Sequence, residues 1–318
     1  MELDIEKIVI GSRGSPLALW QANWIKSQLE ELHSALEVEI KIIKTSGDKI
    51  QDVPLAKIGG KGLFVKEIEE ALLREEVDIA VHSMKDVPMQ MPFELEISVI
   101  TERENPFDAL ISKDNIKLDD LPKNAKVGTG SLRRSSQLLK YRPDLKIFPL
   151  RGNIDTRLKK LDSEGLDAII LASAGLRRMG WGDKITEVIS PDVLLPAMGQ
   201  GAVGIEARKR DPEVHHALID LDDEQTHLAV DAERAFVGQL EGGCQVPIGA
   251  YATIDEETDE LTLKGIVSSL DGKTVYQADK LGPSLDAKKL GRELGQDILR
   301  MGADKILQEI YQQNDSEG

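Results

Sequence analysis

A Lys-Asp pair at the end of an apolar run is the first feature of the sequence that could take part in chemistry. Residues 80–88 read AVHSMKDVP and place Lys85 beside Asp86. A carboxylate there could accept hydrogen bonds from a ligand N–H and stabilise a developing cation, while the lysine could bind an anion. An ordinary surface ion pair has the same two residues, and the pattern alone favours that explanation.

The single cysteine, Cys244, is a second candidate. It lies in residues 241–247, which read EGGCQVP. Most lone cysteines are inert, buried hydrophobes. This one follows a predicted helix end on two glycines, where a thiol could be a nucleophile or an attachment point. One cysteine cannot form an internal disulfide and no charged-then-apolar leader opens the chain, so we expect a cytoplasmic protein.

Basic residues gather in one stretch of an otherwise acidic chain. The 318 residues include 40 basic and 56 acidic ones, a formal net charge of −16, yet residues 126–160 contain ten Lys or Arg against two Asp. This composition suits an anion pocket, although a solvated basic helix face is the more usual explanation. Nucleic acid is a weaker alternative, because only Tyr141 and Phe148 could stack on a base there.

Other familiar motifs are out of context or absent from the sequence. Gly199, Gly201 and Gly204 match the dinucleotide fingerprint GxGxxG, but a strand is predicted over residues 203–207, where that motif requires a helix. The five histidines do not form metal-ligand spacings, and no apolar run approaches the roughly 18 residues of a membrane-spanning helix. We therefore expect no nicotinamide, flavin, metal or membrane site.

Alternating strands and helices must position the candidate groups. Two successive sets of strand, helix, strand, helix and strand are predicted, at residues 7–10, 16–32, 38–44, 64–74 and 77–81, and again at 127–130, 132–141, 146–150, 154–161 and 167–172. Ser15 and Pro16 are typical of a helix start. This order favours a mainly parallel α/β sheet, whose ligands bind at the carboxyl ends of the strands.

The character of the sequence changes beyond residue 211. From there to the end it carries 9 basic and 23 acidic residues. A helix is predicted at 225–240, short strands at 249–254, 261–267 and 274–277, and one long helix at 284–311, loosened by Gly291, Gly295 and Gly302. We expect a separate small α+β domain with an acidic surface, which begins near residue 220.

Seven segments together closely resemble the porphobilinogen deaminase family, also called hydroxymethylbilane synthase. They are GSRGSPLAL (11–19), GGKGLF (59–64), AVHSMKDVP (80–88), GTGSLRR (128–134), LRGNIDTR (150–157), LPAMGQGAVG (195–204) and EGGCQVPIG (241–249). The resemblance implies an α/β fold of two periplasmic-binding-protein-like domains with mixed sheets, plus a small C-terminal α+β domain that carries the cofactor cysteine. The implied domains are residues 1–101 plus 201–219, 102–200, and 220–318.

The resemblance also implies an activity and a cofactor. Members of this family are transferases that condense four porphobilinogen molecules head to tail into linear hydroxymethylbilane and release ammonia, in tetrapyrrole, porphyrin and heme biosynthesis. The implied cofactor is a dipyrromethane joined to Cys244 by a thioether. On these family grounds the inert explanations of Cys244 and Asp86 are set aside. A monomer that binds the small-molecule substrate, and neither nucleic acid nor membrane, is expected.

Residue roles follow from the same resemblance. Asp86 would hydrogen-bond pyrrole N–H groups and stabilise the cation left by the loss of ammonia, and arginines would bind the many carboxylates. The implied catalytic residues are Asp86, Arg13, Arg151 and Arg157; the substrate-binding residues are Arg13, Ser15, Gln21, Arg151 and Arg157; the cofactor-binding residues are Ser83, Lys85, Thr129, Ser131, Arg133 and Arg134; and a lid over the cleft contains Lys57, Lys61 and Phe64. Gly14 departs from the family, which often has a larger residue there.

Two other functions are compatible with parts of the sequence. A non-catalytic binding module for organic anions would carry no covalent adduct. A nucleic-acid-binding regulator that uses residues 126–160 would bind DNA with a steep dependence on salt.

Overall fold

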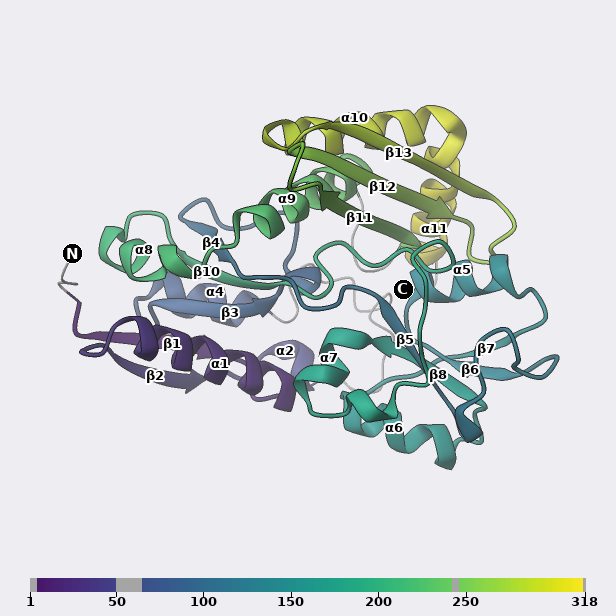
Figure 1. The fold of residues 1–318 in the computed structure, drawn as a ribbon, viewed down its shortest axis with the longest axis horizontal. Helices are drawn as coiled ribbons and strands as arrows, with labels where there is room; N and C mark the ends of the chain where they lie inside the picture. The colour runs from purple at the N-terminus through teal and green to yellow at the C-terminus, as the bar shows by residue number, and fades with distance from the viewer. Residues whose placement is uncertain (1–4, 50–64, 242–245, 317–318) are drawn as a thin grey trace. The chain divides into compact units, whose positions relative to one another are not determined.

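The computed structural model describes residues 5–49, 65–241 and 246–316, which form two compact units (Figure 1). Within these residues, unit 1 comprises 5–49, 65–104 and 202–227, and unit 2 comprises 105–201, 228–241 and 246–316. The described chain therefore passes from unit 1 to unit 2 after residue 104, returns after residue 201, and leaves unit 1 again after residue 227.

Unit 1 is built on a mixed sheet of strands in the order β2-β1-β3-β10-β4. The strands are β1 (Lys7–Ser12), β2 (Glu37–Ile42), β3 (Ile79–Ser83), β4 (Leu95–Ile100) and β10 (Val203–Arg208). β1 runs parallel to β2 and β3, whereas β10 is antiparallel to both β3 and β4. The mainly parallel sheet expected from the element order is therefore wrong, because a distant strand is inserted between two earlier ones.

Helices cover both faces of this sheet. α1 (Pro16–Leu32) begins at the predicted residue, where the Ser15 hydroxyl accepts a hydrogen bond from the Ala18 amide at 3.4 Å. Its buried side chains pack with those of Ile8 and Ile10, which point to one face. α4 (Lys66–Leu73) packs Ile68 and other apolar residues on the opposite face. The remaining helices of unit 1 are α2 (Ser46–Lys49), α8 (Pro212–Leu218), and the 3₁₀ turns η1 (Met84–Asp86) and η4 (Ile219–Leu221).

Unit 2 contains a second mixed sheet in the order β7-β6-β8-β5-β9. The strands are β5 (Asp108–Ser112), β6 (Lys126–Gly128), β7 (Lys146–Phe148), β8 (Ala168–Ala172) and β9 (Glu187–Val188). β5 is antiparallel to β8, while β6 is parallel to β7 and β8. α5 (Leu132–Tyr141) packs on one face, and α6 (Ile154–Ser163) and α7 (Ser173–Arg178) pack on the other. Short 3₁₀ turns lie at η2 (Lys113–Asn115) and η3 (Gly182–Lys184).

The C-terminal part is an antiparallel meander with helices, which are seen in green and yellow in Figure 1. The elements are α9 (Glu224–Gln239), β11 (Ile248–Ile254), β12 (Glu260–Ser268), β13 (Val275–Pro283), η5 (Ser284–Asp286), α10 (Ala287–Ile298), the π-helical turn η6 (Leu299–Ala303) and α11 (Asp304–Ser316). The predicted combination of two α/β parts with mixed sheets and a small α+β part is confirmed.

The single long helix predicted at 284–311 is wrong. It is divided at η6, where Gly302 has a φ of +115°, a conformation that glycine adopts without steric cost. Gly291 and Gly295 do more than loosen the helix. A Cβ on Gly295 would lie 2.7 Å from the Gln239 side chain, and one on Gly291 would meet the carbonyl oxygen of Ala232. Both glycines therefore permit the close approach of α10 to α9.

Candidate cofactor and substrate site

A pocket in unit 1 collects polar side chains from the start of α1 and the end of β3. Arg13, Ser15, Gln21, Ser83 and Asp86 line it, together with His82 and the apolar residues Leu17, Ala18, Val65 and Val81. β1 and β3 are parallel neighbours, so their carboxyl ends lie at the same edge of the sheet. This topology brings together five side chains that the resemblance assigns to substrate or cofactor.

Two polar residues that line this pocket, Gln21 and Ser83, bind each other. Gln21 is buried, and its Nε2 donates a hydrogen bond to the Ser83 hydroxyl at 3.0 Å. This bond joins α1 to the end of β3, directly before the η1 turn. On that turn Asp86 is exposed at the pocket, whereas Lys85 is not among the residues that line it. A hydrogen bond fixes the backbone of the turn, because the Met84 amide donates to the Ala202 carbonyl at 3.1 Å.

Charges of both signs meet in the unit 1 pocket. The start of α1 presents backbone N–H groups and the positive end of the helix dipole, which favour a bound anion. The Arg13 guanidinium adds a positive charge beside it, while Asp86 supplies a carboxylate at the β3 end. The pocket can therefore bind a ligand that presents both carboxylates and N–H donors.

A second group of predicted residues lies in unit 2, where β6 and β7 end. The Thr129 amide donates to the Phe148 carbonyl at 2.9 Å, and the Thr129 hydroxyl accepts from the Ser131 amide at 3.2 Å. Ser131 is the N-cap of α5. The loops after the two strands touch, since a Cβ on Gly130 would lie 2.6 Å from the carbonyl oxygen of Leu150.

Arg151 follows directly on this contact. It is partly buried, burial lowers the pKa of its guanidinium, and no residue in the described part of the chain forms a hydrogen bond or ion pair with it. Arg157 is placed on α6, where its Nε donates to the Gly152 carbonyl at 2.7 Å. A desolvated cation without an anionic neighbour is suited to a carboxylate ligand.

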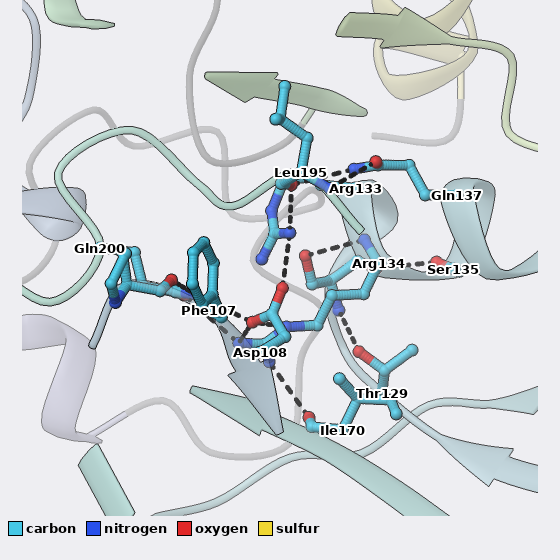
Figure 2. A network of polar contacts seen from close by, with 12 residues as sticks. Phe107, Asp108, Thr129, Arg133, Arg134, Ser135, Gln137, Ile170, Leu195 and Gln200 are labelled. Carbon is cyan, nitrogen blue, oxygen red and sulfur yellow. Dashed lines mark hydrogen bonds and ion pairs between the residues drawn. The ribbon is translucent and has the colours of Figure 1, made fainter. Parts of the chain in front are cut away.

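Arg133 and Arg134 are buried, and both are ion-paired with Asp108 (Figure 2). Arg133 Nη1 lies 2.7 Å from one carboxylate oxygen, and Arg134 Nη2 lies 2.7 Å from the other. Burial alone would raise the pKa of Asp108, but the two guanidinium charges outweigh it and hold that pKa well below its ordinary range. Gln200 donates to the same carboxylate at 3.0 Å.

Asp108 itself was missed by the sequence reasoning. Its signal was an acidic residue at the start of the apolar run ALI, which is unusual for a buried strand. The other members of the predicted set, Cys244, Lys57, Lys61 and Phe64, lie outside the described residues. The predicted residues that are described therefore form two groups, one in each unit.

No group of three or more His, Cys, Asp or Glu side chains in the described part of the chain could hold a metal ion. None of the described helices is both long and apolar enough to cross a membrane.

Two family models match the chain. Residues 8–216 match the one described as porphobilinogen deaminase, dipyromethane cofactor binding domain, and residues 227–300 match the one described as porphobilinogen deaminase, C-terminal domain. The chain belongs to the porphobilinogen deaminase family. The porphobilinogen deaminase of Geotalea uraniireducens strain Rf4 is 53% identical over 97% of this chain and 96% of its own. That of Syntrophobacter fumaroxidans is 53% identical over 96% of this chain and 98% of its own.

Solved structures with a similar fold include solute-binding proteins. The periplasmic aliphatic sulphonate binding protein SsuA of Escherichia coli has a TM-score of 0.39 at 17% identity and covers 74% of this chain and 71% of its own. The probable amino-acid transporter binding protein YtmK of Bacillus subtilis has a TM-score of 0.41 at 14% identity, over 70% of this chain and 94% of its own. These scores are too low to bear on the function of a porphobilinogen deaminase.

Proposed function

We propose that this chain condenses four porphobilinogen molecules head to tail into linear hydroxymethylbilane and releases four molecules of ammonia, a transferase step of tetrapyrrole and heme biosynthesis. Its membership of the porphobilinogen deaminase family supports this activity. The observation that carries the proposal is the unit 1 pocket, which Asp86 lines together with Arg13 and Ser15.

The residues present fit a dipyrromethane cofactor. Each of its pyrrole rings carries an acetate and a propionate, which need cationic or N–H partners, and a pyrrole N–H, which needs an acceptor. In unit 1 the start of α1 can supply N–H partners and Asp86 an acceptor. In unit 2 the start of α5 can supply N–H partners, and Arg151, which has no partner among the described residues, can supply a cationic one. When bound through Cys244, the dipyrromethane supplies the pyrrole carbon to which the first substrate is joined.

Asp86 carries the central role in this proposal. Its carboxylate accepts hydrogen bonds from pyrrole N–H groups and stabilises the positive charge that develops on the substrate as ammonia leaves. Its exposure at the pocket, on a turn fixed by the Met84 amide, suits that role because little reorganisation is needed when the charge appears.

The other residues bind and orient carboxylates. Arg13, Arg151 and Arg157 hold the acidic side chains of the growing chain, and Ser15 and Gln21 contact the incoming substrate. The cofactor is held by Ser83, Lys85, Thr129 and Ser131. Arg133 and Arg134, which Asp108 fixes by ion pairs in the first turn of α5, add positive charge. Lys57, Lys61 and Phe64 form the lid. We further propose the domains 1–101 plus 201–219, 102–200 and 220–318, and a monomer that works in the cytoplasm without nucleic acid.

Intact-mass spectrometry tests the proposal most directly. Protein purified from cells that make porphobilinogen should carry the extra mass of one dipyrromethane, which peptide mapping should place on Cys244, and Cys244→Ala should lack it. A bare sequence mass for the wild-type chain would overturn the assignment and would favour a non-catalytic anion-binding module.

Asp86→Asn tests the role of the carboxylate. The variant should keep the cofactor mass while turnover falls by about 10²-fold or more, the usual cost of removing an electrostatic stabiliser. Asp220→Asn, which changes an exposed carboxylate of unit 1 outside the pocket, is the matched control and should leave turnover unchanged. Near-normal turnover of Asp86→Asn would refute the assigned role.

A further inference from the structure

A cluster of titratable groups lies beneath α4, on the face of the unit 1 sheet opposite α1. His82 Nε2 lies 2.8 Å from Glu206 Oε2, and both residues are buried, at 6% and 1% exposure. The other carboxylate oxygen of Glu206 is buried with no hydrogen-bond partner among the described residues. Glu69 lies on α4, the helix that packs on this face of the sheet.

The strand register explains why these groups meet. Gly204 is opposite His82 and Glu206 is opposite Ala80 in the antiparallel β3–β10 pair. Directly opposed residues point to the same face of a sheet, so His82 and Glu206 both point to the face that Ala80 shares with Ile68 of α4. A hydrogen-bonded pair of polar side chains thus occupies an otherwise apolar layer between helix and sheet.

Stability alone does not account for a carboxylate at residue 206. Replacing a buried ion pair by well-packed apolar residues is often neutral or stabilising, and a carboxylate oxygen left unpaired in the interior is costly. Ala80 and Ile68, which lie on the same face as Glu206, are buried apolar residues, so a hydrophobic residue would suit this position. The position of Glu206 therefore calls for another explanation.

β10 also supports the turn that carries Asp86. The Ala202 carbonyl, directly before the strand, accepts a hydrogen bond from the Met84 amide. The side chain of Met84 lies against Gly204 so closely that a Cβ there would collide with its sulfur. The strand thus holds His82 through Glu206 and Met84 through Gly204, on both sides of Ser83.

We propose that Glu206 is a positioning residue, which acts through the His82 imidazole to fix the turn from Ser83 to Asp86. The expected effect on kcat rests on the proposed function, whereas the expected effect on the backbone of the turn does not. The charges that act on the carboxyl of Glu69 are those of Glu206 on β10 and His82 on β3. Burial first, and the charge of Glu206 second, raise the pKa of Glu69 to about 7.

Amide hydrogen exchange of Glu206→Gln tests the positioning directly. Glutamine keeps the shape of the side chain but replaces the carboxylate that contacts the imidazole with an amide. We expect exchange in residues 83–87 to accelerate by about tenfold or more, while residues 262–266 of β12, in unit 2, keep their wild-type rates. Glu70→Gln is the matched control, because Glu70 also belongs to α4 but is paired with Arg74 at the surface.

Kinetics separate positioning from a merely structural role. We expect Glu206→Gln to lower kcat by about tenfold or more with KM within about twofold, because transition-state geometry is lost and ground-state binding is not.

Unchanged exchange of residues 83–87 in Glu206→Gln would overturn the proposal, whatever the activity. If Glu206→Gln does not fold, His82→Gln replaces it, with the same expectations and the same refuting result. If the wild-type chain carries no cofactor and turns nothing over, the proposed function fails, and the exchange data still decide whether Glu206 positions the turn.

Discussion

Replacement of Asp108 by asparagine would leave two buried guanidinium groups without their common anionic partner. The carboxylate is fully buried, and its two oxygens are each 2.7 Å from an arginine nitrogen, one of Arg133 and one of Arg134. An asparagine would keep one carbonyl acceptor, but its NH₂ group would face further N–H donors. Removing one partner of a buried ion pair costs about 3 to 5 kcal/mol, because the remaining charge is left uncompensated.

The pH dependence of this loss has a definite sign. The folded-state pKa of Asp108 is held below its unfolded value of 3.8, so its stabilising contribution is present above that value and is lost as the pH falls through the folded pKa. The difference in unfolding free energy between wild type and Asp108→Asn should therefore be constant near neutral pH and should shrink in acid.

Urea unfolding, followed by circular dichroism and tryptophan fluorescence, measures this difference. Asp192→Asn is the matched control, because Asp192 is also in unit 2, but its side chain is 84% exposed and lies 3.8 Å from Lys264. The control should change the unfolding free energy by less than about 1 kcal/mol. If Asp108→Asn were also within about 1 kcal/mol of wild type, the reasoning that Asp108 compensates two buried charges would be refuted.

Three further outcomes are expected. Gly265→Ala should destabilise the chain by about 1 to 3 kcal/mol in thermal melts, because its Cβ would lie 2.5 Å from the Phe236 ring, and unchanged stability would contradict that packing. Arg151→Met in the cofactor-free Cys244→Ser background should not lower stability, since it removes a desolvated charge that has no partner among the described residues. In the otherwise wild-type chain it should lower the fraction of protein that carries the cofactor, as measured by mass. Glu69 binds a proton more tightly in the folded state, so its contribution to stability should fall as the pH rises from 4.5 to about 7. Between these pH values, the unfolding free energy of Glu69→Gln in urea titrations should fall by roughly 1 kcal/mol less than that of the wild type, a figure reduced because Glu69 is partly exposed. The same pH dependence in both proteins would contradict the raised pKa.

Local signals in the sequence were enough to define several elements. α1 and α5 begin at the predicted residues, because Ser15 and Ser131 are N-caps whose hydroxyls accept a backbone amide, and Pro16 is favoured in the first turn. The strand at residues 203–207 was also predicted, and it is this strand that separates the GxGxxG match from a nucleotide site.

Long-range features were not accessible in the same way. The prediction that the basic stretch forms an anion pocket did not anticipate that Arg133 and Arg134 are buried against Asp108. Their burial depends on β5 running antiparallel to β8, which brings a residue 25 positions away in the chain beneath α5. The pairing of His82 with Glu206, 124 residues apart, likewise depends on the insertion of β10 and leaves no local signal.

The insertion of β10 between β3 and β4 has a consequence for the order in which the protein is made. During synthesis the ribosome produces β3 and β4 before most of unit 2, and β10 only after β5 to β9. Since β10 pairs with both earlier strands, their inner edges have no partner until the chain beyond residue 208 has emerged. Unit 1 therefore completes its sheet late, when the sheet of residues 108–188 has already been synthesised. Until then the edges of β3 and β4 are exposed, and these edges are where the nascent chain needs protection from aggregation.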